Sequence, residues 1–376
     1  MRIGIITQPL HSNYGGLLQN YALQQVLLRM GHEPITIDQK NVPPPLYIVL
    51  GSAIKTLLLK SVGKGKLRKL PLSKRQNECI LCNIKSFVDN YIRHTPKVEG
   101  YKEIKTMAEN LLLDAFIVGS DQVWRPCYNR HLYHSFLDFA ISWKVKKVAY
   151  AASFGVDSWE YTVRQTQKCK ELIQLFDAVS VREKSGIALC SDYFNREACQ
   201  MLDPTMLLSA EDYIKLVEQE SEPPSKGNLL IYILDNELNK TDLVAKIAEE
   251  LGLMPFSVKD GGWKKRVDKM EMLTHPSVTS WLRGFMDAEF VICDSFHGSV
   301  FSIIFNKPFI VIPNKNRGNT RFDSLLQLFG LESRFIEGND WSVVFEPIDW
   351  GKVNQRKRVL QQDALAFLSS TLQEDN

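Results

Sequence analysis

The sequence predicts an α/β fold of two halves, each built around a parallel β-sheet. Short apolar runs alternate with segments of helical periodicity along most of the chain, which is the pattern of α/β proteins. A length of 376 residues suits two domains of ordinary size. The stretch 220–227, rich in Pro, Ser and Glu, is the best linker, so we expect domains over residues 1–222 and 223–376.

The first half begins with a strand-helix-strand unit, which favours a parallel sheet. Arg2–Thr7 is the first expected strand, and apolar residues at every fourth position predict a helix over Leu17–Met30, ended by Gly31. Pro34–Ile37 is the second expected strand. Later apolar runs predict strands at 114–119, 146–152 and 178–181, and the run 199–203 leads into Pro204.

The second half repeats the same alternation of strands and helices, which again indicates a parallel sheet. A long final helix is expected over 349–372, and we allow for its packing back on the N-terminal domain. The other expected strands are 229–234, 290–294 and 308–313, and the other expected helices are 241–251, 277–286 and 298–305.

A segment of different character interrupts the first half at about 42–98. Eight basic residues and no acidic residue fall between Ser52 and Gln76, and leucines are interleaved with them. Such a segment is compatible with contact with an anionic membrane surface. A solvated helical excursion or an oligomer contact is the simpler explanation, and the oligomeric state stays open.

Composition excludes several other classes of protein. The 46 Lys and Arg residues nearly balance the 43 Asp and Glu residues, and a net charge of +3 does not by itself indicate nucleic-acid binding. Seven cysteines scattered over so long a chain do not indicate a disulfide framework. Neither a signal peptide nor a membrane-spanning run is recognised. We therefore expect a soluble, cytoplasmic protein that binds no nucleic acid.

Ligands of open α/β sheets bind beyond the carboxyl ends of the strands, and the first two such places carry suitable residues. In the loop 11–16, Gly15 and Gly16 precede a helix and would let backbone N–H groups approach an anion, although a tight turn explains them equally well. No dinucleotide or phosphate-loop motif is present there. In 119–126, Asp121 stands at a strand end, where it suits a general base or a sugar contact, or simply caps a turn.

The third place, where the strand 290–294 meets a helix, gives the strongest signal. His297 stands between Ser295 and Gly298, at the positive end of the following helix dipole. An anionic group there would find an imidazole and backbone donors together. The alternative is a structural histidine whose hydrogen bonds are all made within the fold. The polar neighbours of His297, Asp294 among them, favour a functional histidine.

Arginines offer cationic partners for such an anion. Arg182 follows the strand 178–181, and Arg317 and Arg321 lie after the strand that ends at Pro313. Guanidinium groups suit carboxylates and phosphates, although loop arginines are commonly just solvated.

A metal site is not expected. Cys79 and Cys82 form a C-x-x-C pair, but only His94 is near enough in sequence to add a zinc ligand. The surrounding pattern is not thioredoxin-like, so a redox role is not expected either. We expect neither a metal nor a cofactor.

Taken together, these short motifs resemble those of the polysaccharide pyruvyl transferase family. They follow a consistent order over about residues 3–325, so the specificity lies in the series and not in any single motif. The matching pieces are Asn13–Gly16 with Gln19 and Tyr21, Ile117–Trp124, Ser180–Glu183, Asp203–Thr205, Asp294–Gly298 with Lys307–Pro308, and Asn319 with Arg321–Phe322.

The resemblance implies a fold and an activity. The fold would be two Rossmann-like domains facing a cleft, as in GT-B glycosyltransferases. The activity would be transfer of the pyruvyl group of phosphoenolpyruvate, the donor substrate, onto two hydroxyls of a sugar in a surface polysaccharide or its precursor, forming a cyclic ketal. A lipid-linked acceptor would place the protein at the inner face of the membrane, in contact through residues 52–76.

The resemblance also implies roles for single residues. His297 matches the family's expected active-site histidine, so we assign it to the phosphate and to proton transfer, and we assign Asp121 to the sugar hydroxyl. Many family members carry an arginine where this chain has Ser295, so Arg182 or Arg321 would supply the missing cation. The expected donor-binding residues are Arg182, Arg321, Ser295, Gly298 and Asn319, and the expected acceptor-binding residues are Asn13, Tyr14, Gly15, Gly16, Gln122 and Trp124.

Three alternatives stay open. A nucleotide-sugar-dependent glycosyltransferase would share the expected architecture. A non-catalytic binding protein on the same scaffold would be consistent with the loss of the family arginine at Ser295. A peripheral membrane scaffold would depend mainly on the basic segment 52–76.

Overall fold

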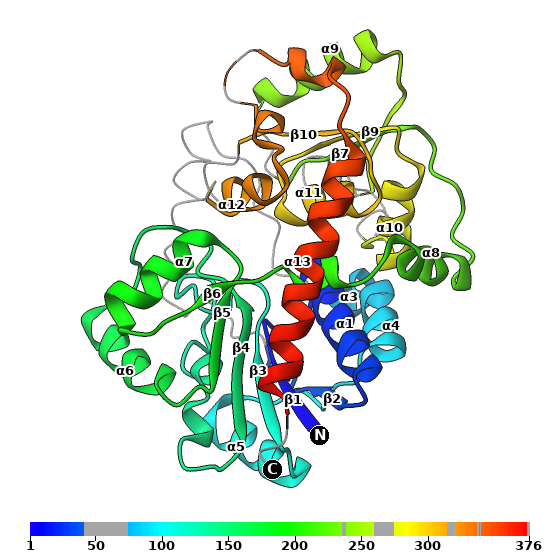
Figure 1. Cartoon of the computed structure of the whole chain (residues 1–376). Helices are drawn as coiled ribbons and strands as arrows, with labels where there is room; N and C mark the ends of the chain where they lie inside the picture. The colour runs from blue at the N-terminus through cyan, green and yellow to red at the C-terminus, as the bar shows by residue number, and fades with distance from the viewer. Residues whose placement is uncertain are drawn as a thin grey trace, which may run out of the picture.

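The computed structural model describes residues 1–40, 74–234, 238–258, 274–313, 320–336, 338 and 340–373. Two parallel sheets form within them, one in the lower and one in the upper half of Figure 1. Most of the basic segment 52–76 lies outside the described residues, so its expected membrane contact stays a prediction. In the part of the chain that is described, no helix combines the length and apolar character needed to cross a bilayer.

The N-terminal sheet has six parallel strands in the order β2-β1-β3-β4-β5-β6. The strand order reverses between β1 and β3, and open α/β sheets bind ligands at such a switch point, beyond the carboxyl ends of the strands. The strands are β1 Arg2–Ile6, β2 Glu33–Thr36, β3 Ala115–Val118, β4 Lys146–Ala152, β5 Ala178–Val181 and β6 Cys199–Gln200.

Helices cover both faces of this sheet, which explains why the central strand β3 is apolar on both faces. Ile117 of β3 packs in the same core as α1 (Tyr14–Arg29), whereas the next residue, Val118, packs with α5 (Gly100–Leu111) on the opposite face. The alternation follows from the two-residue period of a strand. The other helices of this domain are α3 Lys74–Ile80, α4 Cys82–Tyr91, α6 Val163–Ile173 and α7 Lys184–Leu189.

The C-terminal sheet has four parallel strands in the order β10-β9-β7-β8. Its order reverses between β7 and β9, so the residues after β9 also lie at a switch point. The strands are β7 Leu229–Tyr232, β8 Pro255–Phe256, β9 Phe290–Cys293 and β10 Phe309–Val311, and the helices are α9 Leu238–Leu251, α10 Val278–Asp287, α11 Phe296–Ile304 and α12 Thr320–Phe329.

Two helices near the expected site begin earlier than the apolar pattern predicts, and a third was not predicted at all. α1 begins at Tyr14, so the expected glycine loop belongs to its first turn. α11 begins at Phe296, which places His297 within the helix. Arg321 lies in the first turn of α12 and not in a loop. Glycine and polar residues in these first turns hide the helical period from a pattern based on apolar residues.

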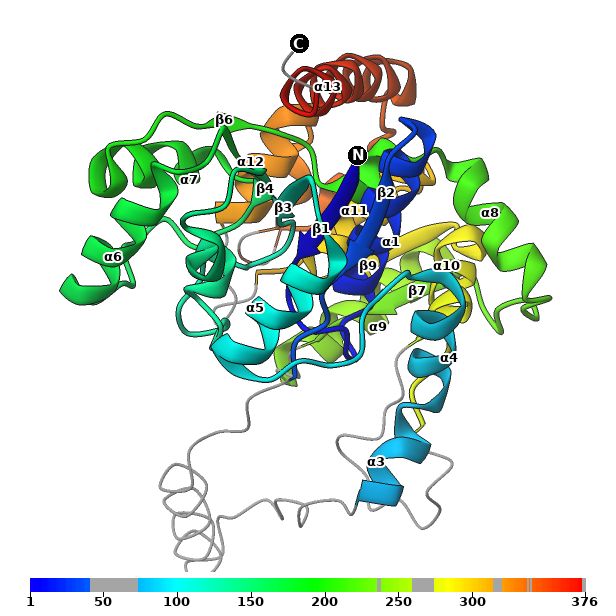
Figure 2. The same cartoon turned by 90° about the horizontal axis from the view of Figure 1, so that it is seen from below.

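The last helix, α13 (Trp350–Thr371), returns from the C-terminal domain and lies along the N-terminal one (Figure 1). Gln361 Nε2 donates to the carbonyl of Met206 at 2.6 Å, and the rings of Phe367 and Tyr150 lie 6.2 Å apart. Leu368 is fully buried in the core that joins them. Viewed from below, α13 is on the far side of the molecule from α3 and α4 (Figure 2).

A second helix also contacts both domains. α8 (Ala210–Gln219) packs on α10, and the ring of Tyr213 lies 5.0 Å from that of Phe301. The same helix pairs its Asp212 with Arg29 of α1 at 2.6 Å. The two sheets are therefore connected through α8 and α13 as well as through the segment between them.

Candidate functional site

The first turn of α11 packs directly on the first turn of α1, and this contact joins the two domains. A Cβ on residue 15 would lie 2.0 Å from His297 Nδ1, so only glycine leaves room for the ring at Gly15. His297 is buried, and its Nε2 has no hydrogen-bond partner among the described residues. Buried polar atoms without a partner are rare, and this one marks a place for a ligand or water.

Asp203 is the polar centre of this site. Its Oδ2 accepts from Arg182 Nη1 at 2.9 Å and from Ser120 Oγ at 3.1 Å, and lies 3.7 Å from His297 Nε2. Its Oδ1 accepts from Thr205 Oγ1 at 2.7 Å. Burial opposes ionisation of this carboxyl, but its interactions with His297 and then with Arg182 lower its pKa below the usual range. Asp203 thus holds an arginine and a histidine from different domains in a fixed relation.

Arg182 is buried, and only one of its three guanidinium nitrogens, Nη1, makes a hydrogen bond within the described chain. Its Nη2 lies 3.6 Å from Asp121 Oδ1, and its Cζ lies 4.3 Å from the centroid of the Phe296 ring. Neither Nε nor Nη2 makes a hydrogen bond within the described part of the chain. A buried guanidinium with two nitrogens that make no hydrogen bond is well suited to a carboxylate or phosphate.

Arg321 approaches the same aromatic ring. Its Cζ lies 5.8 Å from the Phe296 centroid, and the His297 ring lies 5.2 Å from it. Burial, and secondarily the charge of Arg182, lower the pKa of Arg321 to about 10. Two buried like charges raise each other's free energy, and an anion bound beside both would stabilise them. The structure therefore brings Arg182, Arg321 and His297 together around Phe296.

Asp121 also belongs to this group, and it lies in the loop that follows β3. Its backbone is left-handed, with φ of 61°, a conformation that Asp adopts more readily than most residues. Its Oδ2 accepts from Asn13 Nδ2 at 2.9 Å. The preceding Ser120 N–H donates to Gln19 Oε1 at 2.9 Å, which fastens the loop after β3 to α1. The carboxylate is thus fixed between Asn13 and Arg182.

Two of the expected acceptor residues are used by the N-terminal domain itself. Trp124 is fully buried, stacks on Phe136 at 5.0 Å and donates its indole N–H to the carbonyl of Ser135. It therefore lies in the core and does not line the site. Gln122 accepts through Oε1 from Arg125 Nη1 at 3.2 Å, which turns its amide oxygen toward that arginine.

The remaining acceptor residues lie in the first turn of α1. Tyr14 donates its hydroxyl to the carbonyl of Pro276 at 2.9 Å and stacks on Trp281 at 5.8 Å, so it joins the domains. A Cβ on residue 16 would lie 2.9 Å from Asn13 Nδ2, so Gly16 leaves room for the asparagine that holds Asp121. Both glycines therefore serve side-chain packing.

The remaining expected donor-binding residues are Gly298, Ser295 and Asn319. A Cβ on residue 298 would lie 2.8 Å from Cys293 Cβ, so Gly298 allows α11 to approach β9 closely. Ser295 is the N-cap residue of α11, and its side chain makes no capping hydrogen bond. Asn319 lies outside the described residues.

Sequence reasoning missed the roles of Asp203 and Phe296. The sequence places Asp203 in the motif Asp203–Thr205, after a short strand, but assigns no role to it. Its role depends on buried cations that are distant in sequence. An aromatic residue such as Phe296 beside apolar residues is ordinarily taken for core.

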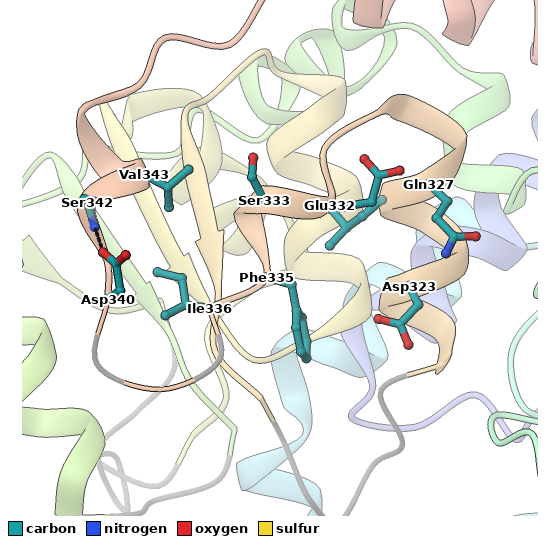
Figure 3. Close-up of a pocket in the computed structure, with 10 residues that line it drawn as sticks. Asp323, Gln327, Glu332, Ser333, Phe335, Ile336, Asp340, Ser342 and Val343 are labelled. Carbon is teal, nitrogen blue, oxygen red and sulfur yellow. Dashed lines mark hydrogen bonds between the residues drawn. The ribbon is translucent and has the colours of Figure 1, made fainter.

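A hollow of about 520 Å³ in the C-terminal domain has the wrong charge for an anionic donor. It lies beside α12 and the residues that follow β10 (Figure 3). Carboxylates of Asp323, Glu332 and Asp340 line it, and the described lining contains neither Lys nor Arg. Negative charge of this kind repels phosphate, so the group around Phe296 is the better anion site.

No metal centre is formed by the described residues: nowhere among them do three or more His, Cys, Asp or Glu side chains gather around a common point. Cys79 and Cys82 are exposed free thiols.

Comparison with known proteins gives a family and a fold. The sequence model of a family described as polysaccharide pyruvyl transferase matches residues 13–316. A search of curated protein sequences finds no significant match.

Among solved structures, UDP-GlcNAc 2-epimerase from Neisseria meningitidis bound to UDP-GlcNAc is similar, with a TM-score of 0.52 and 9% identity, over 99% of this chain and 99% of that one. UDP-bound MnaA of S. aureus has a TM-score of 0.48 and 12% identity, over 96% of this chain and 87% of that one. Such identities concern the fold alone. The expected GT-B-like arrangement of two Rossmann-like domains is confirmed.

Proposed function

This chain belongs to the polysaccharide pyruvyl transferase family. We therefore propose that it moves the pyruvyl group of phosphoenolpyruvate onto two hydroxyls of a sugar, forming a cyclic ketal. The acceptor is a surface polysaccharide or a precursor of one. The observation that carries the proposal is the buried group of Arg182, Arg321 and His297 around Phe296.

Phosphoenolpyruvate brings two anionic groups, a carboxylate and a phosphate. The unused Nε–H and Nη2–H of Arg182 suit one of them, and Arg321 suits the other. The N-terminus of α11 adds backbone N–H groups and a partial positive charge on the side of His297. Together these groups replace the cation that an arginine at position 295 would supply.

Transfer begins when the methylene carbon of phosphoenolpyruvate gains a proton and becomes a methyl group, which leaves positive charge on the neighbouring carbon. One sugar hydroxyl attacks that carbon and loses its proton, and the bond to the phosphate oxygen breaks. The second hydroxyl then attacks the same carbon and loses its proton to close the ketal. The two protons released by the hydroxyls balance the one gained by the methyl carbon and the one gained by phosphate.

The proton transfers need an acid near the donor and a base near the sugar. His297 Nε2 is buried and has no hydrogen-bond partner among the described residues, which suits it to hold a proton for the methylene carbon or the phosphate. Asp121, fixed by Asn13, receives the proton of the attacking hydroxyl. Asp203 is a positioning residue, because it contacts both the arginine and the histidine.

Isothermal titration of the full chain with phosphoenolpyruvate, and separately with UDP-GlcNAc, tests the proposal. We expect phosphoenolpyruvate to bind and Arg321→Lys to weaken that binding by about 2–5 kcal/mol, because a desolvated charged pair loses its guanidinium geometry. Arg164→Lys, on the exposed side of α6, is the matched control and should bind as the wild type does. Binding of the nucleotide sugar without binding of phosphoenolpyruvate would favour a glycosyltransferase and overturn the proposal.

A further inference from the structure

A pocket of about 550 Å³ opens beside the proposed reaction site, between α4 and the residues that follow β1 and β2. Its volume falls in the range of roughly 300–1,000 Å³ that is usual for small-molecule sites. Most of its wall is apolar, formed by Leu10, Leu81, Ile84, Val88 and Pro96.

The pocket adjoins the proposed reaction site along the chain, and one of its walls contacts the C-terminal half. His11 lines it and belongs to the same loop as Asn13, whose amide holds Asp121. Two residues of chain reach at most about 7 Å, so the pocket wall and the asparagine are close neighbours. On the side of α4, Asn83 Nδ2 donates to the carbonyl of His275 at 2.9 Å, which anchors this wall to the C-terminal half.

One buried oxygen atom of the wall, Asp38 Oδ2, makes no hydrogen bond within the described chain. Asp38 has a side chain only 1% exposed, and its Oδ1 accepts from the N–H of Leu10 at 3.1 Å. Its Oδ2 has no hydrogen-bond partner in the described chain, and the nearest cation, Lys97 Nζ, is 3.7 Å away. A buried carboxylate oxygen of this kind is a strong acceptor for a ligand that donates O–H or N–H.

The chemistry of the wall favours a neutral ligand with both polar and apolar surface. The charged side chains of the wall nearly balance, since it contains Lys85 and Lys97 together with Asp38, Glu78 and Asp89. A hydrocarbon chain would leave Asp38 Oδ2 without a hydrogen bond, and a buried acceptor left in that state costs about 1–3 kcal/mol. A pyranose ring supplies hydroxyl donors on its edge and C–H groups on its face, which match the carboxylate and the apolar wall.

We propose that this pocket binds one saccharide unit of the acceptor, with a sugar hydroxyl donating to Asp38 Oδ2 and the face of the ring lying against Ile84 and Leu81. The proposal rests on the proposed function only in naming this sugar as part of the acceptor. The pocket then sets which saccharide is accepted, while the transfer itself takes place at His297.

Saturation-transfer NMR with a defined set of probes tests the inference. The probes are the methyl glycosides of glucose, galactose, mannose, N-acetylglucosamine and N-acetylmannosamine, each added to the full chain without any donor. We expect at least one to receive saturation from the wild type. Leu81→Trp, which fills the pocket from its half-buried rim, and Asp38→Asn should each weaken that binding at least tenfold. Val359→Trp, exposed on α13, is the matched control and should leave it unchanged.

Absence of saturation for every probe, or equal saturation in the wild type and in folded Leu81→Trp, would overturn the inference. Thermal melting of each variant shows whether it is folded. Failure here is separable from failure of the proposed function, because no donor is present. If phosphoenolpyruvate binds and neither substitution changes the saturation of the sugars, only the assignment of this pocket is wrong. If the sugars respond and phosphoenolpyruvate does not bind, only the donor is wrong.

Discussion

The position of the His297 ring requires a glycine at residue 15, because the ring occupies the space where a Cβ of that residue would lie. We predict that Gly15→Ala displaces the ring and reduces transfer at least tenfold, although alanine is the better helix former. Gly351→Ala, in the first turn of α13, is the control and should keep full activity. Turnover of purified variants measures both. Full activity of Gly15→Ala would mean that the ring position is unimportant.

Asp203 should also stabilise the folded protein, through its buried ion pair with Arg182. Asp203→Asn removes one charge from a buried pair and should lower the free energy of unfolding by about 3–5 kcal/mol at pH 7. The folded-state pKa of this carboxyl is depressed, so its contribution is complete above the ordinary Asp pKa of about 4 and declines as the pH falls below that value. Urea unfolding at pH 7 and pH 3.5 should therefore show a smaller difference between wild type and variant at the lower pH. A difference independent of pH would contradict this account.

Some residues of the site were predictable and others were not. His297 and Asp121 follow the ends of β9 and β3 within a few residues, where the sequence pattern alone indicates ligand contact. Trp124 stands beside one of them, but apolar packing determines its place in the core. Asp203 and Phe296 depend on partners from the other domain, which no local pattern reveals.

Among the helices, α13 is the best place to test how the two domains pack together. Leu368 is fully buried on this helix, whereas Leu365, three residues earlier, is 37% exposed. Leu368→Ala should lower the free energy of unfolding by about 2–5 kcal/mol, because it leaves a cavity in the shared core. Leu365→Ala should cost well under half as much. Similar losses for both, measured by urea unfolding, would mean that α13 does not pack as described.

Strands were easier to predict from the sequence than the starts of helices. β4 and β5 have the predicted bounds, because buried parallel strands are continuous apolar runs. The helices α1 and α11 begin before their apolar pattern, since their first turns contain glycine and polar residues that face the other domain. Helices α4 to α8 were not predicted as separate elements.

At the scale of the whole molecule, the alternation of strands and helices was enough to predict two parallel sheets, and the structure confirms them. The relation between the sheets was not derivable from that pattern. It depends on contacts such as Tyr14 with Trp281 and Gln361 with Met206, which join residues far apart in sequence.

The basic segment 52–76 yields a prediction about where the protein works. We expect the full chain to sediment with liposomes that contain anionic lipid, since each cation near such a surface contributes about 1 kcal/mol. Binding should fall steeply in 1 M salt, where the Debye length is about 3 Å, with a residual part from the leucines. The test variant replaces Lys64, Lys66, Arg68 and Lys69 by Gln, and the control replaces Arg164, Lys170, Lys352 and Arg358, which are exposed elsewhere. Equal sedimentation of the two variants would leave the segment without a membrane role.

A transfer assay measures the proposed reaction at His297 itself. The purified chain is incubated with phosphoenolpyruvate labelled with ¹³C in its methylene group and with the five methyl glycosides as acceptors. We predict a ¹³C methyl signal of a ketal together with an equal amount of inorganic phosphate in the ³¹P spectrum. His297→Ala should lose both by at least about a hundredfold, the scale of general acid catalysis, while His32→Ala, outside the site, keeps them. Phosphate release without a ketal, or an undiminished ketal signal from His297→Ala, would contradict the account.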